Sequence, residues 1–212
     1  MDMRPIQAEL LSGSALYREV VLEKLVNARE SVWLATANVK AMYVESKGRF
    51  VPLVEVLDGL AARGVSLRLL HAELPSRPFR AAFDARARLV SGGLELKVCP
   101  RVHFKAVLVD GAWVYLGSAN LTGAGLGAKA DGARNFELGF ATEDFDVIDR
   151  VTALYEAVWS GAECRGCRLR SVCPDPIGPL PTRPPRVRSS RRAARLGRAR
   201  RLERPTLESP RR

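Results

Sequence analysis

A short segment near the middle of the chain combines polar side chains with two apolar runs. His103 and Lys105 lie two positions apart, Asp110 follows the lysine after four residues, and Gly117-Ser118-Ala119-Asn120 comes six residues later. Residues 105–109 and 112–116 are rich in apolar and β-branched residues, and the Asp-Gly pair between them is typical of a tight hairpin turn. Side chains alternate between the faces of a strand, so the histidine and the lysine point the same way, as do the serine and the asparagine.

Such a hairpin offers an imidazole, an ammonium, a hydroxyl and an amide to one place. The imidazole can act as a nucleophile, and the other three groups can bind the oxygens of an anionic tetrahedral centre. The alternative interpretation is a β-hairpin that carries a histidine and a lysine on its surface without a chemical role.

The pattern resembles the signature of the phospholipase D superfamily, and the resemblance extends to Arg134-Asn135-Phe136-Glu137, where members often carry an acidic residue that hydrogen-bonds the histidine. In the order of elements it covers residues 10–159. It implies hydrolysis of a phosphodiester through a phosphohistidine, without a metal or other cofactor for catalysis. The catalytic set is then His103 as nucleophile, Lys105 and Asn120 as ligands of the substrate oxygens, Ser118 as a further donor, Glu137 as the group that fixes the imidazole tautomer, and Asp110, which we expect to act structurally at the hairpin turn.

The motif occurs once, which matters because in-line displacement needs a nucleophile on one side of phosphorus and an acid on the other. His71 is the only other histidine, and no lysine stands two residues after it. Members of the superfamily have two such motifs facing each other, so the resemblance implies a homodimer with a shared active site. A role for His71 in the site stays open, because ligands of open α/β sheets often bind at strand ends. Its alternative is a local hydrogen-bonding residue.

The periodicity of the chain predicts an α/β fold with a mixed central sheet flanked by helices on both faces. Helices are expected over residues 15–28, 51–63, 77–90 and 145–159, the last with Asp144 as its N-cap. Strands are expected over residues 31–37, 65–70, 94–98, 105–110, 112–116 and 136–141. We divide the chain into a catalytic domain (residues 1–162), a cysteine-rich metal-binding segment (163–174) and a disordered tail rich in arginine and proline (175–212).

The cysteines form a second pattern. Cys164, Cys167 and Cys173 give the spacing Cys-x2-Cys-x5-Cys-Pro, and Cys99 lies four residues before His103. Four thiolates suit a structural zinc ion or an iron–sulphur cluster, and the alternative is a set of solvent-facing thiols without a metal. The spacing is similar to the C-terminal three-cysteine run of some RecB-type nucleases, whose fourth cluster ligand also lies upstream.

The positive charge is concentrated at one end of the chain. The formal net charge is +11, and residues 175–212 contain 12 arginines against three acids, which leaves about +2 for residues 1–174. The arginine-rich tail favours nucleic acid as the substrate, although anionic phospholipid would be attracted as well. The alternatives are a phospholipase D that acts on lipid head groups and a catalytically silent nucleic-acid-binding protein. The sequence shows neither a secretory signal nor a transmembrane segment, so we expect a soluble cytoplasmic protein.

Overall fold

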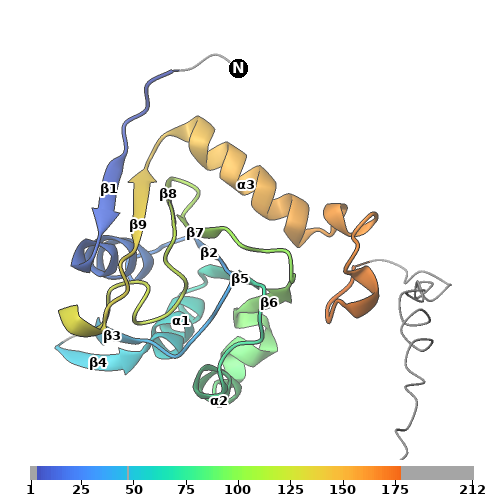
Figure 1. Cartoon of the computed structure of the whole chain (residues 1–212). Helices are drawn as coiled ribbons and strands as arrows, with labels where there is room; N and C mark the ends of the chain where they lie inside the picture. Colours follow the sequence, from blue (N-terminus) through green and yellow to red (C-terminus); the bar gives the residue numbers. More distant parts are fainter. Residues whose placement is uncertain (1–3, 47, 178–212) are drawn as a thin grey trace, which may run out of the picture. The chain divides into compact units, whose positions relative to one another are not determined.

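The computed structural model describes residues 4–46 and 48–177, and these are built around a sheet of seven strands (Figure 1). The strand order is β1-β9-β8-β7-β2-β5-β6. β2 pairs in parallel with β5 and β5 with β6, whereas all other pairs are antiparallel. The sheet is therefore mixed, as predicted. Its strands are β1 (Glu9–Ser12), β2 (Ser31–Thr36), β5 (Ser66–His71), β6 (Glu95–Val98), β7 (Lys105–Val109), β8 (Trp113–Gly117) and β9 (Leu138–Thr142).

Helices cover both faces of this sheet. On one face, α3 (Phe145–Trp159) packs against side chains that include Leu108 and Val114. On the other face, the helix Leu16–Leu25, α1 (Leu53–Ala62) and α2 (Arg77–Asp84) contribute to a core that includes Val107. The neighbours Val107 and Leu108 thus enter different cores, as the two-residue period of a strand requires. The predicted layer arrangement is confirmed.

α3 begins where the sequence indicates. The Asp144 side chain accepts a hydrogen bond of 3.1 Å from the backbone N–H of Val147, which confirms the predicted N-cap. Near the other end of α3, the Tyr155 ring stacks between Trp33 and Trp159, with ring centroids 5.3 and 5.7 Å away. These aromatic contacts fix the helix against β2.

The turn of the central hairpin also agrees with the prediction. Asp110 and Gly111 have φ angles of 54° and 61°, and Ala112 donates a backbone hydrogen bond of 3.1 Å to Val109. Positive φ at both central residues matches the right-handed twist of the two flanking strands. The register pairs Lys105 with Gly117, so the two halves of the motif meet at the open end of the hairpin.

Several elements differ from the sequence-based expectation. The first helix is of the π type and spans Leu16–Leu25, and the third predicted helix divides into α2 and a π-helical turn, Leu89–Gly93, in which Gly92 has φ 102°. β1 was not predicted, and neither was the two-stranded sheet of β3 (Tyr43–Ser46) and β4 (Arg49–Pro52). The second predicted helix begins late, at Leu53, because the residues before it belong to β4.

After α3 the described chain continues through two short 3-10 turns, Ala162–Cys164 and Arg170–Val172, as far as residue 177. From residue 178 onward, the predicted tail lies outside the described residues. A search of the described part finds no helix with the length and apolar character that a membrane crossing requires.

Candidate active site

With the exception of Asp110, the predicted catalytic residues stand at the edge of the sheet where the parallel strands end. β7 runs antiparallel to β2 and therefore starts at this edge, β8 returns to it, and β9 starts from it. Lys105, Gly117 and Gly139 form one row across the three strands. His103 precedes this row and Ser118 follows it, so the topology gathers the motif at the carboxyl edge, where open α/β sheets bind ligands.

His103 and Lys105 form a compact pair. The imidazole is exposed, whereas the lysine is buried with 7% of its surface accessible. The Lys105 ammonium donates a hydrogen bond of 2.6 Å to the His103 carbonyl, and its Nζ lies 3.4 Å from Nδ1 and 3.5 Å from Nε2 of the imidazole. The arrangement places a fixed positive charge beside an accessible nucleophile, which suits an attack on an anionic centre.

Asn120 is oriented by the end of β2. Its Oδ1 lies 3.1 Å from the Thr36 hydroxyl and accepts hydrogen bonds of 3.2 Å from the backbone N–H groups of Ala37 and Asn38. The Thr36 hydroxyl is buried and also accepts a 3.1 Å bond from the N–H of Leu121. Because the oxygen of the Asn120 amide is held by β2, its NH2 group is the part that can donate to a substrate.

The structure thus adds Thr36 to the residues that the sequence indicates. The only sequence signal for it was a threonine inside an otherwise apolar strand, 84 residues before its partner. A pattern of that kind does not reveal which distant side chain it will contact.

Ser118 and Glu137 form the third part of the site. The Ser118 hydroxyl donates to Oε2 of Glu137 and accepts a 3.1 Å bond from the N–H of Leu138. The other carboxylate oxygen accepts a 3.0 Å bond from the Asn135 side chain. Glu137 therefore lies at the predicted edge, but within the described residues its partners are Ser118 and Asn135, and no hydrogen bond joins it to the His103 imidazole.

Close packing around Gly117 explains why the Gly-Ser-x-Asn segment begins with a glycine. A Cβ atom on Gly117 would lie 2.7 Å from the Leu138 carbonyl oxygen and would collide with the Tyr115 hydroxyl. Gly139 is equally restricted, with the Leu116 carbonyl 2.6 Å from the position of its missing Cβ. Tyr115 is fully buried between these glycines, and its burial raises the pKa of the phenol to about 12. The close row of glycines lets the chain deliver Ser118 directly beside β9.

Asp110 stands apart from this cluster. The five residues of β7 separate it from the catalytic edge by roughly 17 Å. Its carboxylate accepts backbone hydrogen bonds of 2.8 to 3.1 Å from Arg29, Glu30 and Ser31. Burial alone would raise the pKa of this carboxyl, but the hydrogen bonds outweigh burial and hold the pKa below its ordinary value. The geometry gives Asp110 the role of joining the hairpin turn to the start of β2.

His71, whose role the sequence left open, ends β5 at the same edge but is 2% exposed. Its Nδ1 is 2.7 Å from the Glu73 carbonyl oxygen. Burial lowers the pKa of the imidazole, and the hydrogen bond to Glu73 opposes that effect only in part. This environment suits a neutral histidine with a local structural bond.

The structure brings the four cysteines together. Cys99, Cys164, Cys167 and Cys173 are all free thiols, and all line one cavity of about 200 Å³. The cavity is lined by residues 97–102 and by Phe104, which belong to the segment that carries His103 and leads into Lys105.

A mixed sheet whose carboxyl edge presents a His-x-Lys pair, a Ser-x-Asn pair and a nearby carboxylate defines a phospholipase D-like protein. Residues 21–159 match the family model described as the cardiolipin synthase, PLD-like domain. The chain belongs to this family, within the phospholipase D superfamily.

Solved structures share the fold. A phospholipase D family member, Nuc from Salmonella typhimurium, matches with a TM-score of 0.50 and 19% identity over 72% of this chain and 95% of its own. NucT from Helicobacter pylori matches with a TM-score of 0.52 and 16% identity over 73% and 96%. The archaeal chromatin protein TrmBL2 matches with a TM-score of 0.50 and 16% identity over 75% and 54%. A comparison with curated protein sequences finds no significant match.

Proposed function

We propose that the protein is a phosphodiesterase that hydrolyses nucleic acid through a phosphohistidine, at a site shared by two copies of the chain. One observation carries the proposal: an exposed imidazole lies 3.4 to 3.5 Å from the ammonium of a buried lysine, at the carboxyl edge of the sheet. A nucleophile next to a fixed cation suits a negatively charged phosphodiester better than a neutral substrate.

The proposed reaction has two steps. A ring nitrogen of His103 attacks phosphorus, the bond to the leaving oxygen breaks, and the partner subunit's His103 gives that oxygen its proton. The same partner imidazole then takes a proton from water, whose oxygen displaces the first histidine and releases the phosphate product. Lys105 and the NH2 group of Asn120 stabilise the non-bridging oxygens in both steps. Ser118 holds Glu137 at the edge of the site.

The surface around the site supports a dimer. Each chain offers one His-x-Lys pair, and His71 is buried against the Glu73 carbonyl, where it is poorly placed to act as the second acid. Phe136 is fully exposed directly beside Glu137, and Leu138 is also more than half exposed. Large apolar side chains next to a catalytic edge are suited to an isologous contact, which would place each motif opposite its copy.

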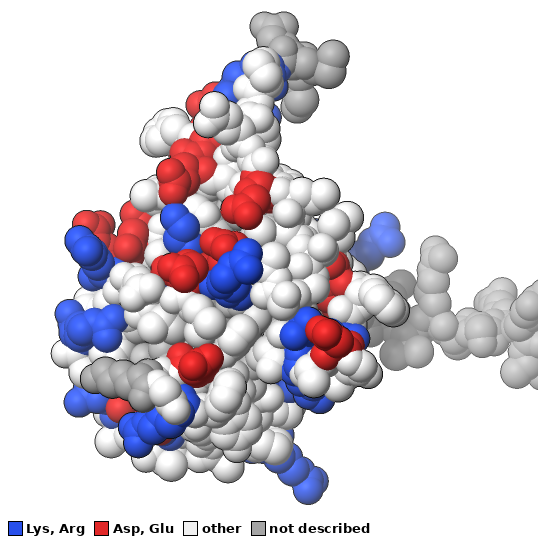
Figure 2. Space-filling view, turned by 90° about the vertical axis from the view of Figure 1, so that its left-hand side faces the viewer, with Lys and Arg blue, Asp and Glu red and all other residues white. Residues whose placement is uncertain are grey.

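Two observations favour nucleic acid as the substrate. Residues 175–212 contain 12 arginines and three acids, a composition that binds phosphate backbones by counterion release. One structure with the same fold is described as a chromatin protein with a novel mode of DNA binding. On the face shown in Figure 2, basic and acidic side chains are interspersed, so this face offers no continuous basic surface. The excess of positive charge that could attract nucleic acid lies instead in residues 175–212.

Hydrolysis of phospholipid head groups is the second candidate, because the matching family model is described as that of a cardiolipin synthase domain. The two candidates share the same chemistry at phosphorus and differ in the substrate that reaches it. Assays on plasmid DNA, RNA and phosphatidylcholine vesicles under identical conditions separate them. We expect cleavage of a nucleic acid that persists during brief exposure to EDTA, since His103 and Lys105 take the role of a metal.

The matched control is His103→Asn, which keeps a polar side chain but removes the nucleophile and should lower turnover by several powers of ten. A His103→Asn protein with nearly normal turnover would refute the phosphohistidine. Nucleic-acid binding without cleavage by the wild type would identify a silent binding protein.

The shared site has a separate test. A dimer of one wild-type and one His103→Asn chain should be almost inactive, because it lacks either the nucleophile or the acid. Half of the wild-type rate in this heterodimer, or full activity in a monomer of 23.3 kDa, would show that each chain carries a complete site.

A further inference from the structure

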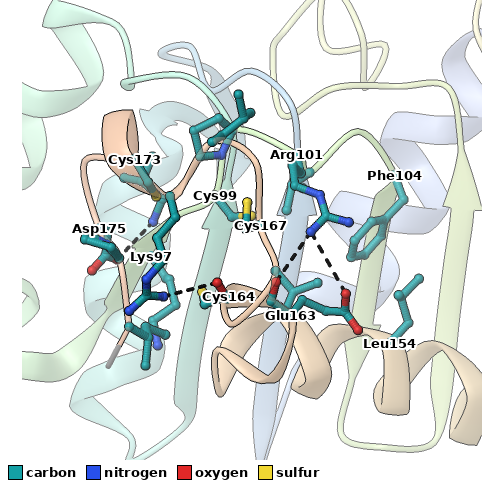
Figure 3. A pocket seen from close by; sticks show the side chains of 18 residues that line it. Lys97, Cys99, Arg101, Phe104, Leu154, Glu163, Cys164, Cys167, Cys173 and Asp175 are labelled. Carbon is teal, nitrogen blue, oxygen red and sulfur yellow. Dashed lines mark hydrogen bonds and ion pairs between the residues drawn. The ribbon is translucent and has the colours of Figure 1, made fainter. Parts of the chain in front are cut away.

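The cysteine cavity joins two parts of the chain that are distant in sequence. Figure 3 shows Cys99 on the connection between β6 and β7, and the other three cysteines on the segment that follows α3. Cys164 and Cys167 share one turn, in which the Cys167 N–H donates a 3.3 Å hydrogen bond to the Cys164 carbonyl. All four cysteines nevertheless line the same cavity.

The volume of the cavity between the thiols distinguishes between types of metal centre. In a mononuclear zinc site each Zn–S bond measures about 2.3 Å, so the four sulphurs stand only about 3.8 Å apart. The thiols instead surround a cavity of about 200 Å³, which leaves room for several metal atoms between them.

The walls of the cavity fit a negatively charged cluster. Val102, Phe104 and Ile177 contribute apolar surface. The charged residues of the lining are three basic ones and two acidic ones, namely Lys97, Arg101, Arg170, Glu163 and Asp175. Apolar surroundings and nearby cations are features that tune thiolate-bound clusters.

We propose that Cys99, Cys164, Cys167 and Cys173 hold a [4Fe–4S] cluster in this cavity. Each thiol loses its proton to solvent as its sulphur binds iron, and the remaining volume is filled by the iron and inorganic sulphide of the cluster. The Cys-Pro pair at Cys173 also ends the cysteine run of bacterial ferredoxins.

The cluster would link the segment that carries His103 to the segment that follows α3. Three residue pairs already join the His103 segment to the end of α3 and the chain that follows it. Lys97 Nζ donates a 2.5 Å bond to the Trp159 carbonyl, and the Val98 N–H donates a 3.3 Å bond to Asp175. Arg101 lies 4.0 Å from the Glu163 carboxylate and donates a 3.5 Å bond to the Glu163 carbonyl. The ion pair between Arg101 and Glu163 is exposed and adds little to the stability of this junction. Four iron–sulphur bonds would join the same two segments through the cluster. One of these bonds would be at Cys99, four residues before the proposed nucleophile His103.

The test is a metal analysis of the full chain, purified without oxygen. We expect about four iron and four acid-labile sulphide per chain, with the broad visible absorption of an iron–sulphur protein that bleaches on reduction with dithionite. If the protein is isolated without iron, reconstitution with ferrous iron and sulphide should give the same stoichiometry. One zinc per chain with no uptake of iron would overturn the proposal, and so would a chain that stays free of metal after reconstitution.

A pair of variants locates the cluster. Cys167→Ser should lose most of the bound iron and the visible absorption, whereas Ser171→Ala, an exposed change in the same segment, should keep both. Iron content that is unaffected by Cys167→Ser would reject this ligand set. The wild-type stoichiometry decides the matter even where Cys167→Ser fails to fold. None of these measurements uses a substrate, so their failure is distinguishable from failure of the proposed phosphodiesterase activity.

Discussion

Replacing Asp110 should lower the stability of the protein and leave its chemistry intact. The carboxylate accepts hydrogen bonds from three successive backbone N–H groups, and a hydrogen bond to a charged acceptor contributes about 1.5–3 kcal/mol. The N–H groups of Arg29 and Glu30 can turn to water, so for Asp110→Ala we expect a loss of about 2–3 kcal/mol from the bonds. A further loss of about 1 kcal/mol should follow because alanine tolerates the φ of 54° poorly.

The substitution Asp110→Asn separates the loss of hydrogen bonding from the backbone strain at positive φ. Asp110→Asn keeps an acceptor oxygen and tolerates positive φ, so its loss should be only about 1–2 kcal/mol. Urea unfolding measures these differences, with Asp149→Asn as the control, since Asp149 is exposed on α3 and its loss should matter by less than about 0.5 kcal/mol.

The pH dependence of the free energy of unfolding provides a second test of the role of Asp110. The pKa of Asp110 is lower in the folded chain than its ordinary value, so the stabilisation is complete above a pH of about 4 and is lost as the pH falls below it. The stability difference between wild type and Asp110→Asn should therefore shrink under acidic conditions. A variant with wild-type unfolding but without phosphodiesterase activity would refute this reasoning and place Asp110 in the chemistry.

Three further outcomes follow from single contacts. Tyr155→Phe should leave the stability unchanged or raise it by up to about 1 kcal/mol in urea unfolding, because the hydroxyl that it removes is buried without a hydrogen bond in the described structure. Gly117→Ala should destabilise the protein by about 3 kcal/mol or more in the same assay, because the new Cβ would meet the Tyr115 ring and rigid backbone. Thr36→Val should lower kcat roughly tenfold with little change in KM, since the Asn120 amide loses one of the groups that orient it, and Thr36→Ser should restore the rate.

The sequence predicted the central hairpin well because the signals are local. Asp110 and Gly111 determine the turn, and the apolar runs on either side determine the strands, so distant contacts add little. The helix after Asp144 was predictable for the same reason, since its N-cap lies within the helix's own first turn. The division of helices between the two faces followed from the alternation of elements.

Other features depend on residues far away and leave little trace in the sequence. β1 has four residues and exists through its pairing with β9, about 130 residues later. In β3 and β4 the exposed Tyr43 and Phe50 stand next to the buried Val44 and Val51, so the sequence lacks the apolar–polar alternation that predicts a half-buried strand. The acceptor bonds of Asn120 join it to residues more than 80 positions earlier. A motif specifies which groups take part, whereas their orientation comes from such non-local contacts.

The connection between β6 and β7 carries His103 and spans a distance that leaves the chain little slack. β6 and β7 are not neighbours, since β5 and β2 lie between them, and three strand spacings amount to about 14 Å. Residues 99–104 must cross this distance, and six residues reach only about 20 Å when fully extended. The crossing is anchored where the Cys99 N–H donates a 2.8 Å bond to the His71 carbonyl, and again where Lys105 donates to the His103 carbonyl. With little slack between these anchors, the position of the imidazole depends on what holds the Cys99 end, and that end is the one that faces the cysteine cavity.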